Sequence, residues 1–407
     1  MLPCPTWRDL LWVVPLLVGI EAAILLLARV RGLRGLFKYV PTMFWIYFVP
    51  TLAATAGLLP PERAADGKEL TAVYSVIGTY CLPVSLVLLL LSVDLKAILK
   101  LGRVALAVML AGSAGIILGG PVVLLLAKPF VPEAIRDTIW KGFGALSASW
   151  IGGSANMIAV GKGLEAPANV YSPMVVVDTI CPYAWMSLLI VLSRYQGAFD
   201  RWNRCDEAIV GQLRARSLSA ATGSGEPLTL PRLAGLLAVA IPAAGVALAL
   251  ATALPAIRGF VNFKAWSLIL ATTIGMVLSF TPARRLERHG ASRVGYVLLY
   301  FVLASIGATT TLTHLASAPV LLGAGVVWIL IHAMFILAAA RLLRAPMSLL
   351  AAASQANVGG PASTPVLAEI YLPGLAPVGL LLAVLGNILG TYLGFVCASL
   401  CEMVNRW

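Results

Sequence analysis

Long apolar stretches, separated by short polar segments, run through the whole chain of 407 residues. Each has roughly the 20 residues that an α-helix needs to cross the hydrocarbon core of a bilayer. The pattern predicts an all-α polytopic membrane protein with about twelve (11–13) transmembrane helices. We place the stretches near 7–29, 37–58, 70–93, 102–127, 138–163, 167–194, 231–254, 264–280, 293–312, 317–341, 345–370 and 374–400.

One polar segment, 194–230, interrupts this pattern and contains a Gly/Ser-rich patch at 222–225. We interpret it as a polar linker. It separates a first transmembrane repeat, 1–193, from a second, 231–407, and each repeat holds six apolar stretches.

A small polar motif with a glycine pair occurs once in each repeat. The first copy, at 147–156, reads SASWIGGSAN, and the second, at 354–363, reads SQANVGGPAS. Glycine pairs beside small polar residues are poor helix formers, and matching interruptions in two halves of a chain point to a transporter binding site. We therefore expect a discontinuous crossing helix near 138–163 and another near 345–370. The expected breaks are at Gly152, Gly153, Gly359, Gly360 and Pro361.

Composition and charge support a membrane location. The chain is 60% hydrophobic and 11% charged, which excludes an ordinary soluble domain. The net charge of +12 lies largely in short loops, as the positive-inside rule predicts for cytoplasmic loops, so we expect no nucleic-acid partner. The predicted location is a bacterial inner membrane with the lipid bilayer as partner.

The basic loops also predict a relative orientation of the two repeats. In the first repeat they follow the first and third stretches, and in the second repeat they follow the second and fourth stretches, counted within that repeat. If all are cytoplasmic, the repeats are inverted relative to each other. Two repeats of six spans joined by a linker would instead be parallel. The charges and the count therefore disagree, either because the linker hides a crossing or because one stretch does not span.

The broken helices predict a binding site for ions and a solute. Helix N-termini present N–H groups that favour anions, while C-terminal carbonyls and side-chain oxygens can ligate Na⁺. The alternative is that small residues only allow two helices to cross closely, which leaves the amides beside the breaks unexplained. The polar groups concerned are Ser147, Ser149, Ser154 and Asn156 in the first copy and Ser354, Gln355, Asn357, Ser363 and Thr364 in the second.

Four further polar residues lie within apolar stretches. An ionisable residue inside a membrane is by default a functional hypothesis, and Asp178 directly follows the first motif. For Glu21 and His332 we favour a structural role, since the first helix suits a scaffold or dimer interface and a single histidine is commonly a packing residue. Asn387 follows the second motif as Asp178 follows the first, either as a site residue or as a contact between helices. We expect Na⁺ near Asn156, Asp178, Gln355 and Asn357.

Other chemistry has no sequence signal. There is no phosphate-binding loop, no cluster of metal ligands and no nucleophile–base pair, so we expect neither an enzyme nor a cofactor beyond a coupling ion, Na⁺ or H⁺.

The two motifs, the Tyr171-Ser172-Pro173 segment leading to Asp178, and the segment 375–379 resemble the DUF819 membrane-protein family over essentially the whole chain. That family is similar to the superfamily of cation:proton antiporters and anion transporters, which includes sodium–bile acid and sodium–glutamate symporters. The resemblance implies inverted repeats, a panel domain and a core domain in which two broken helices cross, with dimerisation through the panel domain. In the antiporters an acid after the first broken helix carries the coupling ion, and Asp178 matches it.

Three functions follow from these observations. The first is Na⁺- or H⁺-coupled symport of a small, anionic organic solute by alternating access. The second is cation/proton antiport through Asp178, for which the chain has one acid and lacks an adjacent acidic pair. The third is a membrane protein that does not transport.

Overall fold

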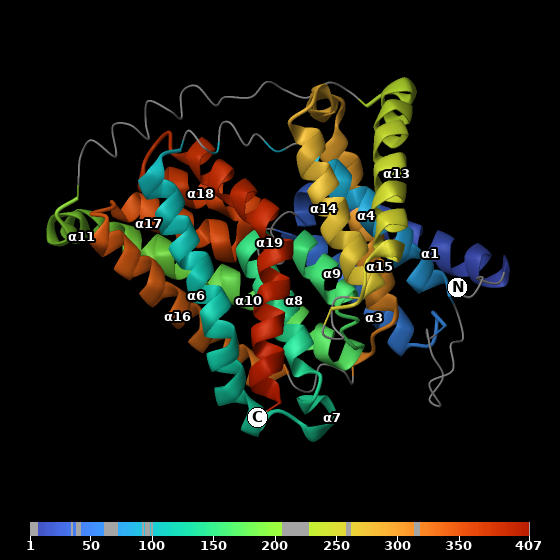
Figure 1. The fold of residues 1–407 in the computed structure, drawn as a ribbon, viewed down its shortest axis with the longest axis horizontal. Coiled ribbons are helices and arrows are strands. Elements are labelled where there is room, and N and C mark those ends of the chain that lie inside the picture. Colours follow the sequence, from blue (N-terminus) through green and yellow to red (C-terminus); the bar gives the residue numbers. More distant parts are fainter. Residues whose placement is uncertain are drawn as a thin grey trace. The chain divides into compact units, whose positions relative to one another are not determined.

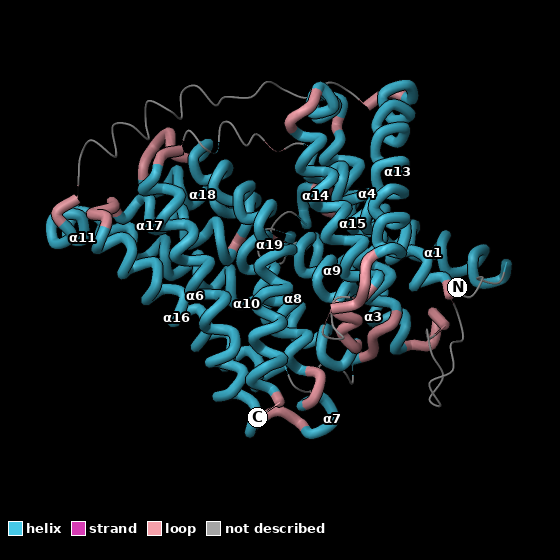
Figure 2. The backbone as a smooth tube through the Cα atoms, in the orientation of Figure 1, coloured by secondary structure: helices cyan, strands magenta, loops and turns pink. Residues whose placement is uncertain are grey.

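The computed structural model describes residues 7–33, 36–37, 42–60, 72–91, 93, 98, 101–205, 228–257, 262–312 and 318–406. Over these residues the protein is helical (Figures 1 and 2), as the sequence predicts. The main helices are α1 (Trp7–Leu27), α3 (Thr42–Thr55), α4 (Val73–Leu91), α6 (Arg103–Ala127), α8 (Ile139–Gly152), α9 (Ser154–Gly163), α10 (Ala168–Leu192), α11 (Gln196–Asn203), α13 (Leu230–Ala253), α14 (Phe263–Ser279), α15 (Ala291–Ala308), α16 (Ala318–Leu342), α17 (Met347–Val358), α18 (Gly360–Tyr371) and α19 (Ala376–Asn405).

These helices follow the apolar stretches. Each stretch contains one helix, except 138–163 and 345–370, which each contain a pair. Within the described residues, eight helices are long and apolar enough to cross a membrane, or nine if α14 is counted with the 3-10 helix η4 (Pro282–His289), to which it is bent by 96°. The apolar α3 is shorter. Of the linker 194–230, only 194–205 and 228–230 are described, and the Gly/Ser patch lies outside the described residues.

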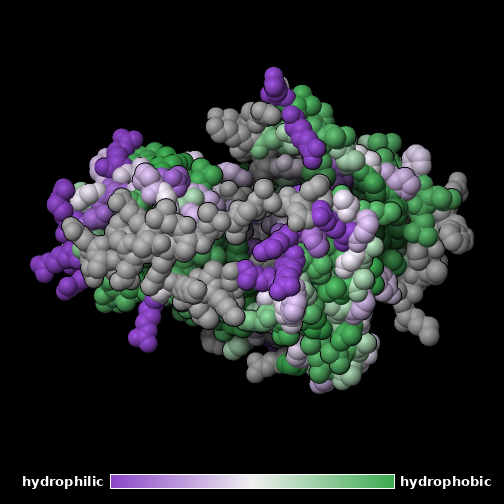
Figure 3. Space-filling view, turned by 90° about the horizontal axis from the view of Figure 1, so that it is seen from above, coloured by the Kyte–Doolittle hydropathy of each residue, from purple (hydrophilic) through white to green (hydrophobic). Residues whose placement is uncertain are grey.

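The described surface carries many apolar side chains, as a bilayer requires. On the face drawn in Figure 3, hydrophobic residues cover broad areas and hydrophilic residues gather in a few places. Large side chains such as Leu126, Leu230 and Leu342 are more than half exposed. In a soluble protein such exposure is unusual over a wide area, whereas in lipid it is the expected outer surface.

The chain divides into two compact units, each built from segments that lie on both sides of the linker. The first unit comprises 1–92, 162–175 and 225–317, and the second comprises 93–161, 176–224 and 318–407. The first therefore contains α1, α3 and α4 with α13, α14 and α15. The second contains α6, the pair α8–α9 and most of α10 with α16, the pair α17–α18 and α19. Each unit therefore takes helices from both sides of the linker.

In the first unit, α4 packs among α13, α14 and α15. Leu88 and Leu91 are fully buried with Leu236 and Ala240 of α13. Gly275 of α14 brings the backbone close to α4, because a Cβ there would lie 3.0 Å from the Val87 Cα. Close backbone approach through small residues is the usual way in which helices associate without a hydrophobic driving force.

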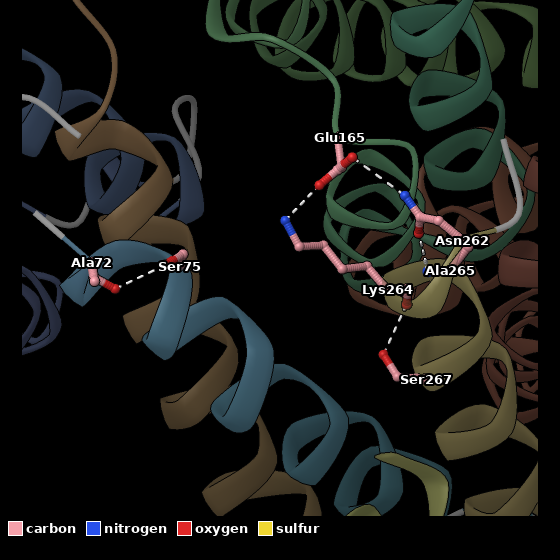
Figure 4. A network of polar contacts seen from close by, with 7 residues as sticks. All are labelled: Ala72, Ser75, Glu165, Asn262, Lys264, Ala265 and Ser267. Atoms are coloured by element: carbon pink, nitrogen blue, oxygen red, sulfur yellow. Dashed lines mark hydrogen bonds and ion pairs between the residues drawn. The ribbon is translucent and has the colours of Figure 1, made fainter. Parts of the chain in front are cut away.

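A polar network ties the loop before α10 to the start of α14 in the same unit (Figure 4). Lys264 Nζ lies 2.6 Å from Glu165 Oε1, and Asn262 Nδ2 donates to Glu165 Oε2 at 3.3 Å. Asn262 also caps α14, since its Oδ1 accepts from the Ala265 N–H at 3.0 Å. Glu165 itself has a φ of 51°, a left-handed conformation that is uncommon outside glycine.

In the second unit, α6 and α16 pack along a glycine-lined face. A Cβ at Gly112 would approach His332 and Ile336, whereas one at Gly119 would approach Trp328 and Ile331. Numbers rise along α6 as they fall along α16, so the two helices are antiparallel.

The paired helices α8–α9 and α17–α18 reverse at their glycine breaks. A Cβ at Gly394 of α19 would touch both Ala148 of α8 and, at 3.0 Å, Val160 of α9. A continuous helix would separate residues twelve apart by about 18 Å. The two halves of this pair therefore lie side by side.

The second pair shows the same reversal. Met347 at the start of α17 and Tyr371 at the end of α18 share one apolar cluster with Leu189 of α10. The Tyr371 hydroxyl donates to the Leu189 carbonyl. The discontinuous helices expected near 138–163 and 345–370 are thus helical hairpins, in which the chain reverses at each break. The reason is physical, since Gly153 and Gly360 adopt positive φ values of 84° and 67°, which turn the chain back instead of continuing the helix.

Candidate functional site

The two hairpins meet at their glycine tips in the second unit. A Cβ built on Gly360 would lie 3.8 Å from the Gly153 Cα, in ordinary van der Waals contact. Each tip begins a helix, α9 at Ser154 and α18 at Gly360. The structure therefore brings together two breaks that lie more than 200 residues apart in the sequence, as the binding-site prediction requires.

Asp178 lies beside the first tip. The Ser154 Oγ donates to the Asp178 Oδ2 at 3.5 Å, and the side chains of Ser149 and Trp150 are also neighbours of this carboxylate. Asp178 and Ser154 are both partly exposed, while Ser149 is buried. A carboxylate at the N-terminus of α9 is favourable because the helix end carries partial positive charge.

Asn387 of α19 borders the same tip. A Cβ on Gly153 would lie 3.4 Å from its Oδ1, and the Asn387 side chain is partly exposed. Asp178 and Asn387 also have matching positions. Trp185, seven residues after Asp178, bonds Ser354 of α17, and Gly394, seven residues after Asn387, packs on Ala148 of α8.

Asn156, by contrast, joins the first hairpin to α19 through hydrogen bonds. Its Oδ1 accepts from the Thr391 hydroxyl at 2.5 Å, and its Nδ2 donates to the Gly152 carbonyl at 2.6 Å and the Asn387 carbonyl at 3.3 Å. The side chain is 3% exposed. Thr391 was not anticipated from the sequence, although its spacing of four residues from Asn387 places both on one helix face.

Asn357 anchors the second hairpin to α6 in a similar way. Its Oδ1 accepts from Ser113 at 2.7 Å, and its Nδ2 donates to the carbonyls of Met109 and Ala353, both at 3.1 Å. It is fully buried. With its amide engaged in this way, Asn357 fixes a helix and leaves no group directed at a ligand.

His332 and Ser354 form part of a buried relay of hydrogen bonds. The His332 Nδ1 donates to the Gly112 carbonyl at 2.9 Å, because a carbonyl oxygen only accepts, and its Nε2 lies 2.9 Å from the Ser354 hydroxyl oxygen. The Ser354 oxygen also accepts from Trp185 Nε1 at 2.9 Å. These bonds hold the imidazole ring in place and agree with the structural role favoured for His332.

Gln355 is the unusual member of the second motif. Its Nε2 donates to Ser363 Oγ at 2.8 Å, and Ser363 donates to the Gly359 carbonyl at 2.9 Å. Its Oε1 is buried without a hydrogen-bond partner among the described residues, although the side chain is only 1% exposed. A buried acceptor without a hydrogen-bond partner lowers the stability of the fold by about 1–3 kcal/mol. This oxygen is therefore suited to bind a cation or to accept a hydrogen bond from a ligand. Thr364, fully buried, bonds the Gly360 carbonyl at 2.7 Å.

Two predicted residues lie apart from the tips. The Ser147 hydroxyl donates a hydrogen bond to the Gly144 carbonyl within α8 at 2.7 Å. Glu21 belongs to the first unit, where it is 5% exposed, its Oε1 has no partner among the described residues, and Tyr300 is a neighbour. Neither is brought to the place where the hairpins meet.

The predicted residues therefore separate into two groups. Asp178, Ser154, Asn387 and Gln355 present oxygens at or beside the hairpin tips, three of them on partly exposed side chains. Of the others, Asn156, Ser354 and Asn357 hold the hairpins against α19, α10 and α6. The hydroxyls of Ser147, Ser363 and Thr364 bond backbone carbonyls within their own hairpins. Oxygen ligands of this kind suit a hard monovalent cation, and the helix N-termini suit an anionic group. No group of three or more His, Cys, Asp or Glu residues in the described part of the chain could hold a metal ion.

Comparison with known proteins agrees with this architecture. The family model described as "Protein of unknown function (DUF819)" matches residues 15–404. The chain is also 26% identical over 356 residues to the "Uncharacterized membrane protein YjcL" of Bacillus subtilis (strain 168), covering 83% of this chain and 85% of that protein. This multi-pass membrane protein with two glycine-tipped hairpins belongs to the DUF819 family.

Proposed function

We propose that this protein is a secondary active transporter that moves a small organic solute together with Na⁺ or H⁺ across the bacterial inner membrane. The observation that carries the proposal is the meeting of the Gly153 and Gly360 tips beside Asp178 and Asn387. Non-helical backbone at membrane depth is tolerated where it is buried in protein or lines a cavity, and transporters use it for substrate and ions.

Hairpins that enter and leave the membrane on the same side would remove the disagreement between the charge pattern and the count. If both re-enter without crossing, ten segments cross: α1, α3, α4, α6, α10, α13, α14, α15, α16 and α19. The basic loops then follow the first, third, seventh and ninth crossings and lie on one side, the cytoplasm. Four basic residues of these loops lie outside the described residues: Arg34, Lys38, Lys96 and Lys100. The two halves would then be inverted repeats, and the antiparallel packing of α6 and α16 supports this proposal.

Roles for the units follow from where the hairpins lie. The second unit would be the core domain, which carries the solute and the ion. The first unit would be the panel domain, which serves as scaffold and offers α1 as a dimer contact. Alternating access would come from movement of the core domain relative to the panel domain.

The coupling ion is assigned to Asp178. The carboxylate of this partly exposed residue and the Ser154 hydroxyl offer oxygens for Na⁺, and protonation of the carboxylate would serve H⁺ coupling. Gln355 Oε1, buried without a described partner, is a second acceptor near the tips.

Cation/proton antiport is the second candidate, and the same acid favours it. An antiporter needs one carboxylate that exchanges a proton for a cation, and Asp178 at the α9 N-terminus fits that need. No acid is adjacent to Asp178 in the sequence, so such an exchange would move one charge per site.

Transport in proteoliposomes separates these functions. The full chain is reconstituted, an inward Na⁺ or proton gradient is applied, and uptake of pooled radiolabelled organic solutes is measured beside a fluorescent report of internal pH. Gradient-driven solute uptake that Asp178→Asn abolishes supports symport. Na⁺-dependent proton efflux without solute uptake supports antiport. Glu133→Gln, on a side chain that is 91% exposed, serves as the matched control and retains activity. Absence of both fluxes from folded protein refutes the proposal.

A further inference from the structure

The charges around the hairpin tips restrict the kind of solute that can bind there. Among the described residues of the second unit, every Lys and Arg lies near a helix end or beyond it, and none lies in the middle of a helix. These residues are Arg103, Lys128, Arg136, Lys141, Arg194, Arg201, Arg204, Arg341, Arg344 and Arg406. Lys141, in the first turn of α8, is twelve residues before Gly153, about 18 Å along a helix. Lys162, in the last turn of α9, is nine residues after Gly153, about 14 Å along a helix. Among the described residues of the second unit and of the two hairpins, no Lys or Arg therefore lies at the tips to bind an anionic solute.

One of the two helix N-termini at the tips already has an anion. Asp178 accepts a hydrogen bond from Ser154, the first residue of α9. A solute carboxylate placed at the same helix end would face this like charge in a medium of low dielectric constant. The α9 end is therefore suited to a cation or to a hydrogen-bond donor.

The other N-terminus, that of α18, carries no acid. The helix has twelve residues and no acidic side chain in its first turn. Its Glu369 lies in the last turn and accepts hydrogen bonds from the Gly374 and Ala376 N–H groups. The first N–H groups of a helix lack intrahelical partners and attract a carboxylate or phosphate.

A second, independent feature beside the α18 N-terminus points to a ligand. The Gln355 side chain lies against Gly359 at the break, and the residue is 1% exposed. Its Oε1 is a hydrogen-bond acceptor that has no partner among the described residues. Its own amide N–H is already given to Ser363. The partner that this oxygen lacks is a donor, and an ammonium group supplies three.

We infer that the solute carries both an ammonium group and a carboxylate, as an amino acid or a short peptide does. The inference rests on the proposed transport function and replaces the purely anionic solute expected from the sequence. The carboxylate binds at the N-terminus of α18, and the ammonium binds among Asp178, the Asn387 amide oxygen and Gln355 Oε1. Asp178 bonds Ser154, Ser154 follows Gly153 in the chain, and Gly153 contacts Gly360. Asp178 and Gly360 are therefore linked through only these two residues. A dicarboxylate would instead bring two negative charges to a place whose side chains carry one.

Thermal unfolding of the purified full chain tests this inference with a chemically matched ligand series. Pools of amino acids and of dipeptides and tripeptides are compared with the same pools after N-acetylation, after methyl esterification, and with C4 to C6 dicarboxylates, each with and without Na⁺. The expected result is a rise in the unfolding temperature with an unmodified pool, and loss of that rise after either modification. Asp178→Asn is expected to lose the response, and Glu133→Gln is expected to keep it.

The outcomes separate this inference from the proposed function. Equal stabilisation by N-acetylated solutes or by dicarboxylates overturns the inference and leaves solute transport intact. Stabilisation by Na⁺ or pH alone, with no effect of any organic pool, overturns the inference and favours antiport. If Asp178→Asn fails to fold, the ligand series on the unaltered protein still decides, because the ammonium and the carboxylate are removed from the solute.

Discussion

Substitution of Gly390 by Ala tests the contact between α19 and the first hairpin. A Cβ at this position would lie 2.7 Å from the Asn156 Cγ, 2.8 Å from its Nδ2 and 2.8 Å from the Gly152 Cα. Carbon atoms pack at about 3.5–4.0 Å, so the new methyl group demands a shift of roughly 1 Å. Neither neighbour yields easily, because Gly152 is backbone and Asn156 is held by three hydrogen bonds.

The expected change in the free energy of unfolding is the difference between a gain in helix propensity and the cost of crowding at the contact. Replacing glycine by alanine inside a helix gains about 0.5–1 kcal/mol when no atom opposes it. Overpacking of a close contact costs about 1–3 kcal/mol. Each displaced interhelical hydrogen bond costs about 0.6 kcal/mol more on average in a membrane protein. We therefore expect Gly390→Ala to lower the free energy of unfolding by about 1–3 kcal/mol.

The matched control is Gly245→Ala in the interior of α13. A Cβ there would have no atom within 4 Å, so only the helix-propensity gain remains. Unfolding is followed by tryptophan fluorescence during titration of mixed micelles with sodium dodecyl sulfate. The midpoint should fall for Gly390→Ala and stay or rise for Gly245→Ala. Equal midpoints for the two variants would refute the claim that α19 touches the backbone of the first hairpin at this position.

Three further predictions use the same protein. The double-mutant cycle of Asn156→Ala and Thr391→Val should give a coupling of about 0.5–1.5 kcal/mol in that titration, and zero coupling would contradict the hydrogen bond between them. Single cysteines at Glu133 and Ala166 should react with a membrane-impermeant maleimide from the same side of the membrane, because α8–α9 re-enters; labelling from opposite sides would restore a crossing helix. Lys264→Met removes an ion pair between two substantially exposed side chains and should change the free energy of unfolding by less than about 1 kcal/mol, and a larger loss would indicate a role beyond surface charge.

The helices were readily predictable from the sequence, because a membrane imposes one rule on all of them. Each spanning segment must satisfy its own backbone hydrogen bonds in lipid, so apolar length alone locates helices such as α6 and α16. The glycine pairs were recognisable as breaks for the same reason. What hydropathy could not tell is whether the chain continues or reverses after a break. That depends on the positive φ of Gly153 and Gly360 and on packing against α19 and α10, which are long-range contacts.

The candidate site was predictable as a region but not residue by residue. Asn156 and Asn357 attracted attention because amides inside a membrane are expensive, and the structure accounts for both through bonds to neighbouring helices. Their partners Thr391 and Ser113 lie more than 230 residues away in sequence, so no local pattern announces them. Asp178 remains the candidate ion-binding residue at the tips, because an ionisable side chain inside a membrane is costly and has few structural uses.

The geometry of the two tips suggests why the two copies of the motif diverged. In the first copy Ser154 follows the glycine pair and donates to Asp178, whereas in the second copy Pro361 stands at the same place and has no N–H or hydroxyl to donate. Asn387, whose position in the second half matches that of Asp178, is a neutral amide and borders the first tip. The tips therefore have one acidic side chain between them, at the N-terminus of α9, and the N-terminus of α18 has no acid in its first turn. This difference between the two copies favours a solute with one positive and one negative end over a solute with two like ends.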